Sequence, residues 1–338
     1  VALDQAIDAF IANPTAETFQ VAKDAWLASR EPYGQTEAYR FANGPIDDED
    51  GPEGLLNAWP LDEGYIDYVV DPSNQGQILR NGIVNDAATY PTIDQALLVD
   101  LNEAGGEKNV SIGYHAIEFL LWGQDLSATG PGARPLTDYT MDTDAERRRQ
   151  YLGLLSDQLL VNLQEMVDAW DPNASGNYRA TFLTLDTNEA LANVFTAIGT
   201  LSKSELAVER MFVAVDNQDQ EDEHSCFADN TDRDIVTNAQ GIANVYRGSY
   251  TRTDGSVVSG PSLADLVEEA DATVAATVNA SVTAALAAVE LIPDPFDQAL
   301  LNEQQVILDA VQALQAQGDN FVAAAAALGV SINNELPD

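Results

Sequence analysis

Apolar residues recur every three to four positions along most of this chain, which is the spacing of amphipathic helices. Helices are predicted over 2–12, 15–30, 93–104, 142–169, 188–215, 235–246, 262–290, 297–317 and 319–328, with short helical pieces near 61–70. A loop rich in proline and glycine is predicted at 31–54. A β-hairpin is predicted at 250–259, because Asp254-Gly255 suits a tight turn. The pattern indicates an all-α fold with two helical, four-helix-bundle-like domains, 1–180 and 181–338, and a minor β-hairpin.

One predicted helix has no broad polar face. Residues 112–122 are apolar almost all the way round, so this helix is expected to be buried. Ser111 is the predicted N-cap and Gly123 the predicted stop. Gly113 is expected to allow a close approach of another backbone segment.

This apolar helix carries His115, one of only two histidines in the protein, and Glu118. Residues three apart lie on the same side of a helix, so the imidazole and the carboxylate point together into an apolar interior. Burying such groups without partners costs several kcal/mol, roughly 2–7 for a neutral polar group. A metal ion bound by His115 and Glu118 offsets this cost, and a purely structural hydrogen bond between them is the alternative.

Further polar residues are candidates for a cleft around that pair. His224 lies in an acidic segment with Asp222, and imidazole and carboxylate groups suit iron, manganese or zinc. Arg40, in a segment that also holds Glu37, is a candidate because arginines are few in this chain and are expected to pair with carboxylates. Glu205 and Arg210, on the predicted helix 188–215, are similar candidates. An exposed acidic loop and ordinary surface ion pairs remain the alternatives.

The charge balance excludes some partners. The chain has 55 acidic and 15 basic residues and a formal net charge of −40, which repels nucleic acid and attracts cations. A solvated acidic surface accounts for most of these charges. The single cysteine, Cys226, allows no intrachain disulfide. We expect no transmembrane segment, and the start at Val1 suggests a processed export product.

Several catalytic sites are absent from the sequence. Two histidines cannot supply a zinc site of three histidines, and no HExxH helix is present. No serine nucleophile motif and no phosphate-binding glycine loop occur either. These absences argue against common hydrolase chemistry.

The motifs resemble those of a known family. Gly113-Tyr114-His115-Ala116-Ile117-Glu118 is similar to the GxHxxE motif of imelysin-like proteins, also classed as peptidase family M75. The segments that begin Arg30-Glu31-Pro32, Glu53-Gly54-Leu55 and Gln220-Glu221-Asp222 resemble its iron-regulated protein A branch. The resemblance covers roughly 15–330. Asp232 departs from it, because the branch is expected to have histidine there.

This resemblance implies two helical bundles and a place in the bacterial cell envelope, periplasmic or lipid-anchored. It also implies binding of iron, another divalent metal or an iron complex during iron acquisition, with other envelope iron-uptake proteins as possible partners. Two alternatives stay open: an M75-type metallopeptidase, and a docking module of an iron-uptake complex in which His115 and Glu118 are purely structural. GxHxxE supplies at most two metal ligands and no obvious base, which favours binding over catalysis.

Overall fold

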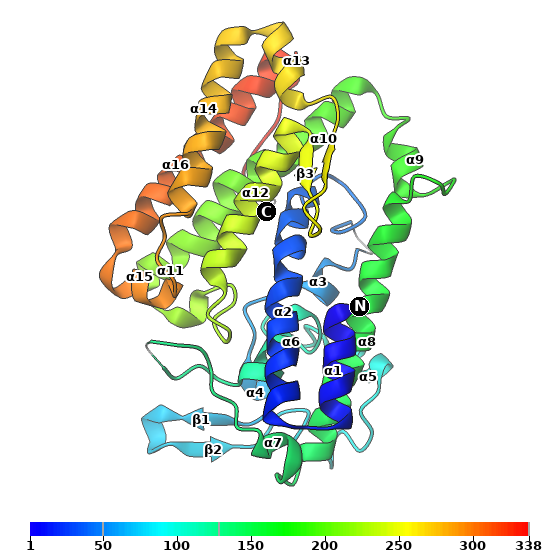
Figure 1. The fold of residues 1–338 in the computed structure, drawn as a ribbon, viewed down its shortest axis with the longest axis vertical. Helices are drawn as coiled ribbons and strands as arrows, with labels where there is room; N and C mark the ends of the chain where they lie inside the picture. The colour runs from blue at the N-terminus through cyan, green and yellow to red at the C-terminus, as the bar shows by residue number, and fades with distance from the viewer. Residues whose placement is uncertain (49–50, 128, 337–338) are drawn as a thin grey trace. The chain divides into compact units, whose positions relative to one another are not determined.

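The computed structural model of the chain describes residues 1–48, 51–127 and 129–336. In this part the regular structure is mainly helical, and the strands form two short antiparallel pairs (Figure 1). The predicted all-α fold with a minor hairpin is therefore confirmed. That hairpin joins β3 (Ser249–Thr251) to β4 (Val257–Ser259).

The described chain forms two compact units, each assembled from separate segments. Unit 1 contains Val1–Ser29, Gly51–Asp168 and His224–Asp229, and unit 2 contains Arg30–Asp50, Ala169–Glu223 and Asn230–Asp338. The boundary falls inside two helices, α2 (Ala16–Thr36) and α8 (Ala145–Trp170). The sequence predicts one boundary near residue 180. In the structure, each unit is built from segments that lie on both sides of residue 180.

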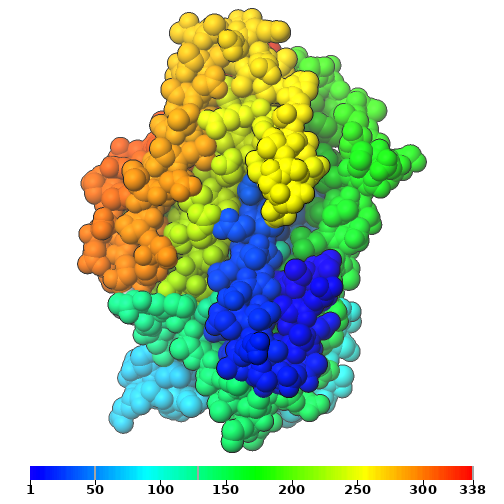
Figure 2. Space-filling view, in the orientation of Figure 1, coloured from blue at the N-terminus to red at the C-terminus, as the bar shows by residue number. Residues whose placement is uncertain are grey.

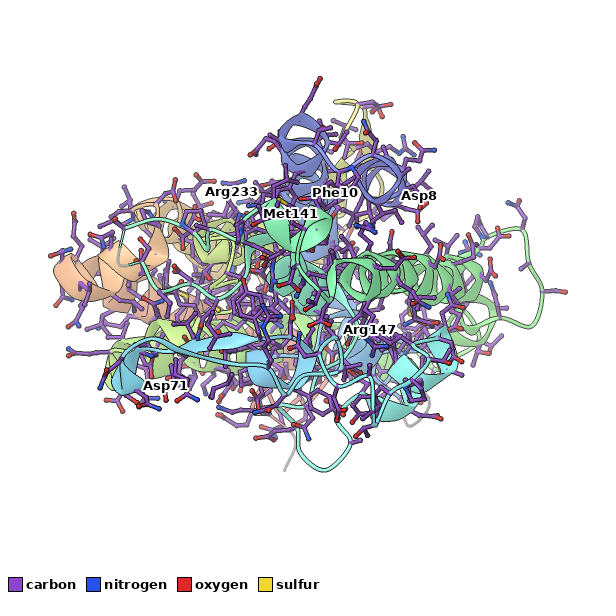
Figure 3. The ribbon with its side chains drawn as sticks, turned by 90° about the horizontal axis from the view of Figure 1, so that it is seen from below. Asp8, Phe10, Asp71, Met141, Arg147 and Arg233 are labelled. Carbon is purple, nitrogen blue, oxygen red and sulfur yellow. The ribbon has the colours of Figure 1, made fainter. Side chains whose placement is uncertain are left out.

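Unit 1 is built mainly from helices around an aromatic core. Besides its parts of α2 and α8, it contains α1 (Ala2–Ala12), α3 (Glu53–Leu56), α4 (Glu63–Ile66), α5 (Gln95–Leu101), α6 (Tyr114–Trp122) and α7 (Thr137–Thr140). Phe10 of α1 stacks on Phe19, with ring centroids 4.7 Å apart, and meets the edge of Tyr139 at 4.8 Å. Asp8, labelled with Phe10 in Figure 3, lies on the exposed side of the same helix. Burial of these rings explains why α1 packs onto α2.

Unit 1 also contains a hairpin that the sequence analysis missed. β1 (Val69–Asp71) pairs with β2 (Gln77–Leu79), and a 3₁₀ turn (Pro72–Asn74) lies between them. The helical prediction over 61–70 was wrong beyond Ile66, where α4 ends. Three-residue strands are too short to show a clear alternation of apolar and polar residues.

Unit 2 is a larger helical bundle. It contains a 3₁₀ turn (Glu37–Tyr39), α9 (Tyr178–Phe182), α10 (Thr187–Thr200), the π-helix η3 (Leu201–Phe212), α11 (Val213–Asn217), a second 3₁₀ turn (Gln220–Asp222), α12 (Thr231–Arg247), α13 (Leu263–Ala270), α14 (Ala272–Val289), α15 (Phe296–Asn302) and α16 (Gln304–Ala327). Helices α14 and α16 run alongside one another (Figure 1). Their buried residues, with those of α10, η3 and α12, form one apolar core.

Some predicted helix ends were wrong because close packing overrides the local residue preference. α2 continues through Pro32 to Thr36, and a Cβ atom at Gly34 would lie 2.0 Å from Thr237 Oγ1 of α12. α16 continues through Gly318, where a Cβ atom would lie 2.5 Å from the Cβ of Lys203. Glycine at these two positions therefore permits close helix packing and does not end a helix.

One predicted helix is divided in the structure. The stretch 262–290 forms α13 and α14, and Asp271 caps α14 by accepting hydrogen bonds from Thr273 N and Val274 N. Its side chain satisfies two amide groups that a new helix start leaves without helical partners.

By length and composition, α14 is the one described helix that is long and apolar enough to cross a membrane, contrary to the expected lack of such a run. Its buried residues belong to the core of unit 2, and 28% of the helix is buried; a single helix of this kind is weak evidence for a membrane span. The absence of a transmembrane segment therefore stays a prediction.

Candidate functional site

Helix α6 is positioned by backbone contacts at both of its ends. Its N-cap is Gly113, not the predicted Ser111, and Gly113 has a φ of +92°. A Cβ atom there would lie 2.8 Å from the Leu56 carbonyl oxygen, so the predicted close approach is real. The predicted stop at Gly123 is also correct, with its N–H donating to Phe119 O at 2.7 Å. Only glycine fits such a left-handed N-cap against another backbone segment.

His115 and Glu118 form a buried pair on this helix. His115 Nδ1 lies 2.9 Å from Glu118 Oε2, and the two side chains are 2% and 0% exposed. Glu118 Oε1 accepts a hydrogen bond from the Ala228 N–H at 2.9 Å. The carboxylate therefore orients the imidazole and also holds the segment His224–Asp229 within unit 1.

That segment brings the second histidine to the first. The ring centroids of His115 and His224 are 4.8 Å apart, with planes inclined at 62°. His224 is 2% exposed, and its Nε2 lies 3.3 Å from Asn57 Nδ2. Its ring also meets the edge of Trp59 at 5.2 Å. The only two histidines of the chain, 109 positions apart in sequence, thus share one buried site in unit 1.

Asn57 and Trp59 were not among the predicted site residues, although the segment Glu53–Pro60 was recognised as similar to the family. Two side-chain amides hold this segment in unit 1: Asn102 donates to Gly54 O at 2.8 Å, and Asn162 donates to Leu55 O at 3.3 Å. An asparagine that follows a short helix has many ordinary roles, so the sequence alone did not assign Asn57 to the site.

The other end of α6 carries a support that the sequence analysis missed. Arg134 Nη2 donates to Phe119 O at 3.3 Å, and Tyr139 Oη donates to Leu120 O. Arg134 and Arg148 both bind Asp67, whose carboxylate is fully buried. Burial alone would raise the pKa of Asp67, but the two guanidinium groups outweigh it and lower that pKa. Arg134 and Tyr139 thus donate hydrogen bonds to backbone carbonyl groups in the last turn of α6.

The four predicted arginine and glutamate residues come together in unit 2. Arg210 Nη2 donates to Glu37 Oε2 at 2.7 Å and to Glu205 Oε1 at 2.8 Å, and Arg210 Nη1 donates to Asn238 Oδ1 at 2.8 Å. Arg40 Nη1 lies 3.3 Å from Glu205 Oε1. Burial would raise the pKa of Glu205, but Arg210 and Arg40 outweigh it and lower that pKa. The cluster is therefore a buried ion network with balanced charges, and surface pairing at i,i+4 was the wrong alternative.

A π-helix explains the pairing of Glu205 with Arg210. These residues are five apart, and both lie in η3, where the backbone repeats with i→i+5 hydrogen bonds. In an α-helix, a five-residue spacing would place them on different faces.

Asp222 lies in the 3₁₀ turn of unit 2, where it accepts a hydrogen bond from Asn217 Nδ2 at 2.7 Å. It is partly exposed, whereas His224 is buried in unit 1. The predicted cleft set is thus divided: His115, Glu118 and His224 share one site in unit 1, and Glu37, Arg40, Glu205 and Arg210 share another in unit 2. No group of three or more His, Cys, Asp and Glu side chains in the described residues is arranged to hold a metal ion.

Known proteins resemble this chain in sequence and in fold. The family model described as imelysin, peptidase family M75, matches residues 1–321. An iron-regulated protein A from Synechococcus elongatus is 28% identical over 330 residues, which cover 94% of this chain and 77% of that protein.

Two solved structures share the fold. One is an iron-regulated protein A precursor from Parabacteroides distasonis, with 20% identity, a TM-score of 0.66 and coverage of 96% of this chain and 88% of that one. The other is an imelysin-like protein from Psychrobacter arcticum, with 14% identity, a TM-score of 0.68 and coverage of 98% and 88%. At these identities the two structures support the fold alone.

Proposed function

We propose, for a chain that belongs to the imelysin family, that His115 and His224 bind iron or another divalent transition metal, as an ion or as a complex. The observation that carries this proposal is the contact between the only two imidazoles of the chain in a buried site. Imidazole nitrogen is a good ligand for iron, copper, nickel and zinc. The relative named iron-regulated protein A supports iron as the first metal to test.

Glu118 would then act through His115. Metal-binding histidines usually place their second ring nitrogen against a carboxylate, which fixes the ring and raises its basicity. Glu118 lies against Nδ1 of His115, so His115 would reach the metal through Nε2. Asn57, beside Nε2 of His224, would orient the second imidazole.

The ligand count favours a metal that arrives with other ligands. Two imidazoles leave at least two positions of a four-coordinate metal to other groups. Because no group of three or more His, Cys, Asp and Glu side chains in the described residues is arranged to hold a metal ion, the remaining coordination positions would go to ligands that arrive with the iron. The same count supports binding over M75-type peptidase catalysis, which needs about three protein ligands and an open position.

The setting of this function would be iron acquisition at the bacterial cell envelope. The acidic balance of the chain, 55 acidic against 15 basic residues, would concentrate cations near the protein surface. The same proposal includes binding of this chain to other envelope proteins of an iron-uptake system.

Calorimetric titration tests the proposal, with Fe²⁺ under anaerobic conditions and iron(III) citrate as the two probes. His115→Ala and His224→Ala are each expected to abolish saturable binding. Glu118→Gln is expected to weaken it about 10- to 100-fold, because the variant keeps the shape but loses the charge that orients His115. Asp222→Asn is the control, since it removes a partly exposed acid near His224 in sequence, and it should bind normally.

Equal affinity in all variants would overturn the metal site and favour the docking alternative. Peptide cleavage by the wild type that is lost in His115→Ala would favour the peptidase. Near-ultraviolet circular dichroism of each variant separates loss of binding from loss of folding.

A further inference from the structure

Unit 2 contains a pocket that the proposed metal site does not use. The end of α2, the C-terminal half of α12 and the β3–β4 hairpin line an open pocket of about 590 Å³. This volume lies within the range of small-molecule sites, roughly 300–1,000 Å³. The hairpin, in yellow, lies on the visible surface in Figure 2. Four of its six strand residues line the pocket, so a hairpin without an evident role in the core forms one wall.

The lining of this pocket is uncharged. None of the described residues that line it is Asp, Glu, Lys or Arg, although 21% of the chain is charged. Partial burial, and then the neighbouring phenol of Tyr250, raise the pKa of Tyr39, so this phenol stays neutral near pH 7. An anion would find no cation here, and a cation would find no carboxylate.

Two amide side chains in the pocket have hydrogen-bonding capacity to spare. Asn244 Nδ2 donates to Gln35 Oε1 at 2.8 Å, and Asn244 Oδ1 accepts from Gln240 at 2.7 Å. Gln35 Nε2 donates to Glu31 O at 3.0 Å. Within the described chain, Gln35 and Asn244 therefore each retain one N–H and one acceptor position. A purely apolar ligand would bury these groups without partners, which is unfavourable.

Two tyrosines complete the lining. Tyr39 is 48% exposed, and Tyr250 lies opposite Val258 in the hairpin. Aromatic faces carry partial negative charge and attract the C–H groups of a ligand. A ligand suited to this lining has an apolar C–H face and a rim of groups that both donate and accept hydrogen bonds.

We infer that this pocket binds a neutral sugar ring, through C–H contacts with Tyr39 and Tyr250 and hydroxyl contacts with Gln35 and Asn244. A pyranose with equatorial hydroxyls has the required apolar face and hydroxyl rim. Its lack of charge matches the uncharged lining and avoids the repulsion that an anionic sugar would meet from a chain of net charge −40.

Titration with cellobiose, followed by NMR of the labelled full-length protein, tests this inference. We expect saturable binding with a Kd of about 1 mM. Tyr250→Ala and Tyr39→Ala should each weaken binding about tenfold, because each removes one aromatic face. Glucuronic acid, which keeps the ring but carries a carboxylate, should bind more weakly than glucose.

Tyr178→Ala provides a matched control. Tyr178 contacts Trp170 at 5.0 Å, as Tyr39 does at 5.7 Å, but it does not line the pocket. Loss of binding in this control would show that disturbed packing around Trp170 is the cause and would overturn the inference. It would also be overturned by no saturable response to cellobiose, or by tighter binding of an end-blocked triglycine peptide than of cellobiose.

Discussion

Two of the buried polar clusters of this protein, both containing residues singled out from the sequence, differ in chemistry. In unit 2, Arg210 and Arg40 balance Glu37 and Glu205, and every one of these four residues has an opposite charge within 4 Å. In unit 1, two imidazoles meet with their ring centroids 4.8 Å apart, beside the carboxylate of Glu118. In the first arrangement, the charges of the four side chains balance one another, so a structural role accounts for it. The second brings together imidazole nitrogens, which is why we propose it as the metal site.

This difference separates two reasons for burying polar residues. A balanced ion network is costly to break, yet replacing it entirely with apolar residues is often tolerated. The nitrogen atoms of an imidazole pair suit transition metals. The sequence can indicate that a polar residue is buried. The residues that surround it in the fold decide whether it belongs to a balanced ion network or to a set of metal ligands.

The largest expected effect comes from breaking the balanced network. Arg210→Met should lower the free energy of unfolding by about 3–5 kcal/mol, because it leaves Glu37 and Glu205 as buried charges without their main cation. Chemical denaturation measures this loss. Metal binding measured at a temperature where the variant is folded should be unchanged if the two clusters have separate roles.

Arg233→Met is the control for that experiment. Arg233 pairs with Glu31 at 2.9 Å, but both side chains are more than 40% exposed. Exposed ion pairs contribute about 0–1 kcal/mol. Equal losses in the two arginine variants would show that burial of the network does not matter.

A smaller effect is expected at the start of α6. Gly113→Ala should destabilise the protein by about 1–3 kcal/mol, because alanine is strained at a φ of +92° and its Cβ would press on Leu56 O. The displaced segment carries Asn57, so metal affinity should fall together with stability.

Gly176→Ala separates these two causes. Gly176 has a φ of +79°, but a Cβ atom there would meet nothing within 4 Å. Its thermal unfolding should show the cost of the backbone conformation alone, about 1–2 kcal/mol. If Gly113→Ala costs no more than this control, the contact with Leu56 does not position the site.

Much of the fold followed from local patterns. The apolar periodicity predicted most of the long helices, and Asp254-Gly255 predicted the β3–β4 hairpin. The errors arose where distant residues decide the outcome. Gly34 and Gly318 suggest breaks in the sequence, but both lie inside helices because a neighbouring helix packs closely against them.

The candidate site was predictable only in part. His115 and Glu118 were evident because a buried helix rarely carries them, and Gly113 was identified as a close-approach position. The meeting of His115 with His224 depends on how residues 224–229 return to unit 1, which no local pattern encodes. The ion pair of Glu205 with Arg210 depends on a π-helix, and an α-helical reading of the sequence hides it.

The smallest expected effect concerns Asp232 in unit 2, whose pKa is shifted in the opposite direction from that of Glu205. Two arginines lower the pKa of Glu205, whereas burial, and then the neighbouring Asp294, raise the pKa of Asp232 to about 6. Asp232 is also the position at which the chain departs from the expected histidine of its family branch. Its carboxylate is thus only partly compensated by the adjacent Arg233.

A raised pKa in the folded state means that the folded protein holds this proton more tightly than the unfolded chain. Asp232 therefore stabilises the fold below about pH 4, and this contribution is lost as the pH rises to about 6. Asp232→Asn should remove that loss, so the variant should be about 1–2 kcal/mol more stable than the wild type at pH 7 and no more stable at pH 3.5. Urea denaturation at both pH values measures the difference.

Asp86→Asn is a control in which the stability should change in the opposite direction. Hydrogen bonds from Thr89 lower the pKa of Asp86, so removal of its carboxylate should reduce stability at pH 7. A gain for Asp232→Asn that is equal at both pH values would show that its ionised carboxylate is already compensated, as that of Glu205 is.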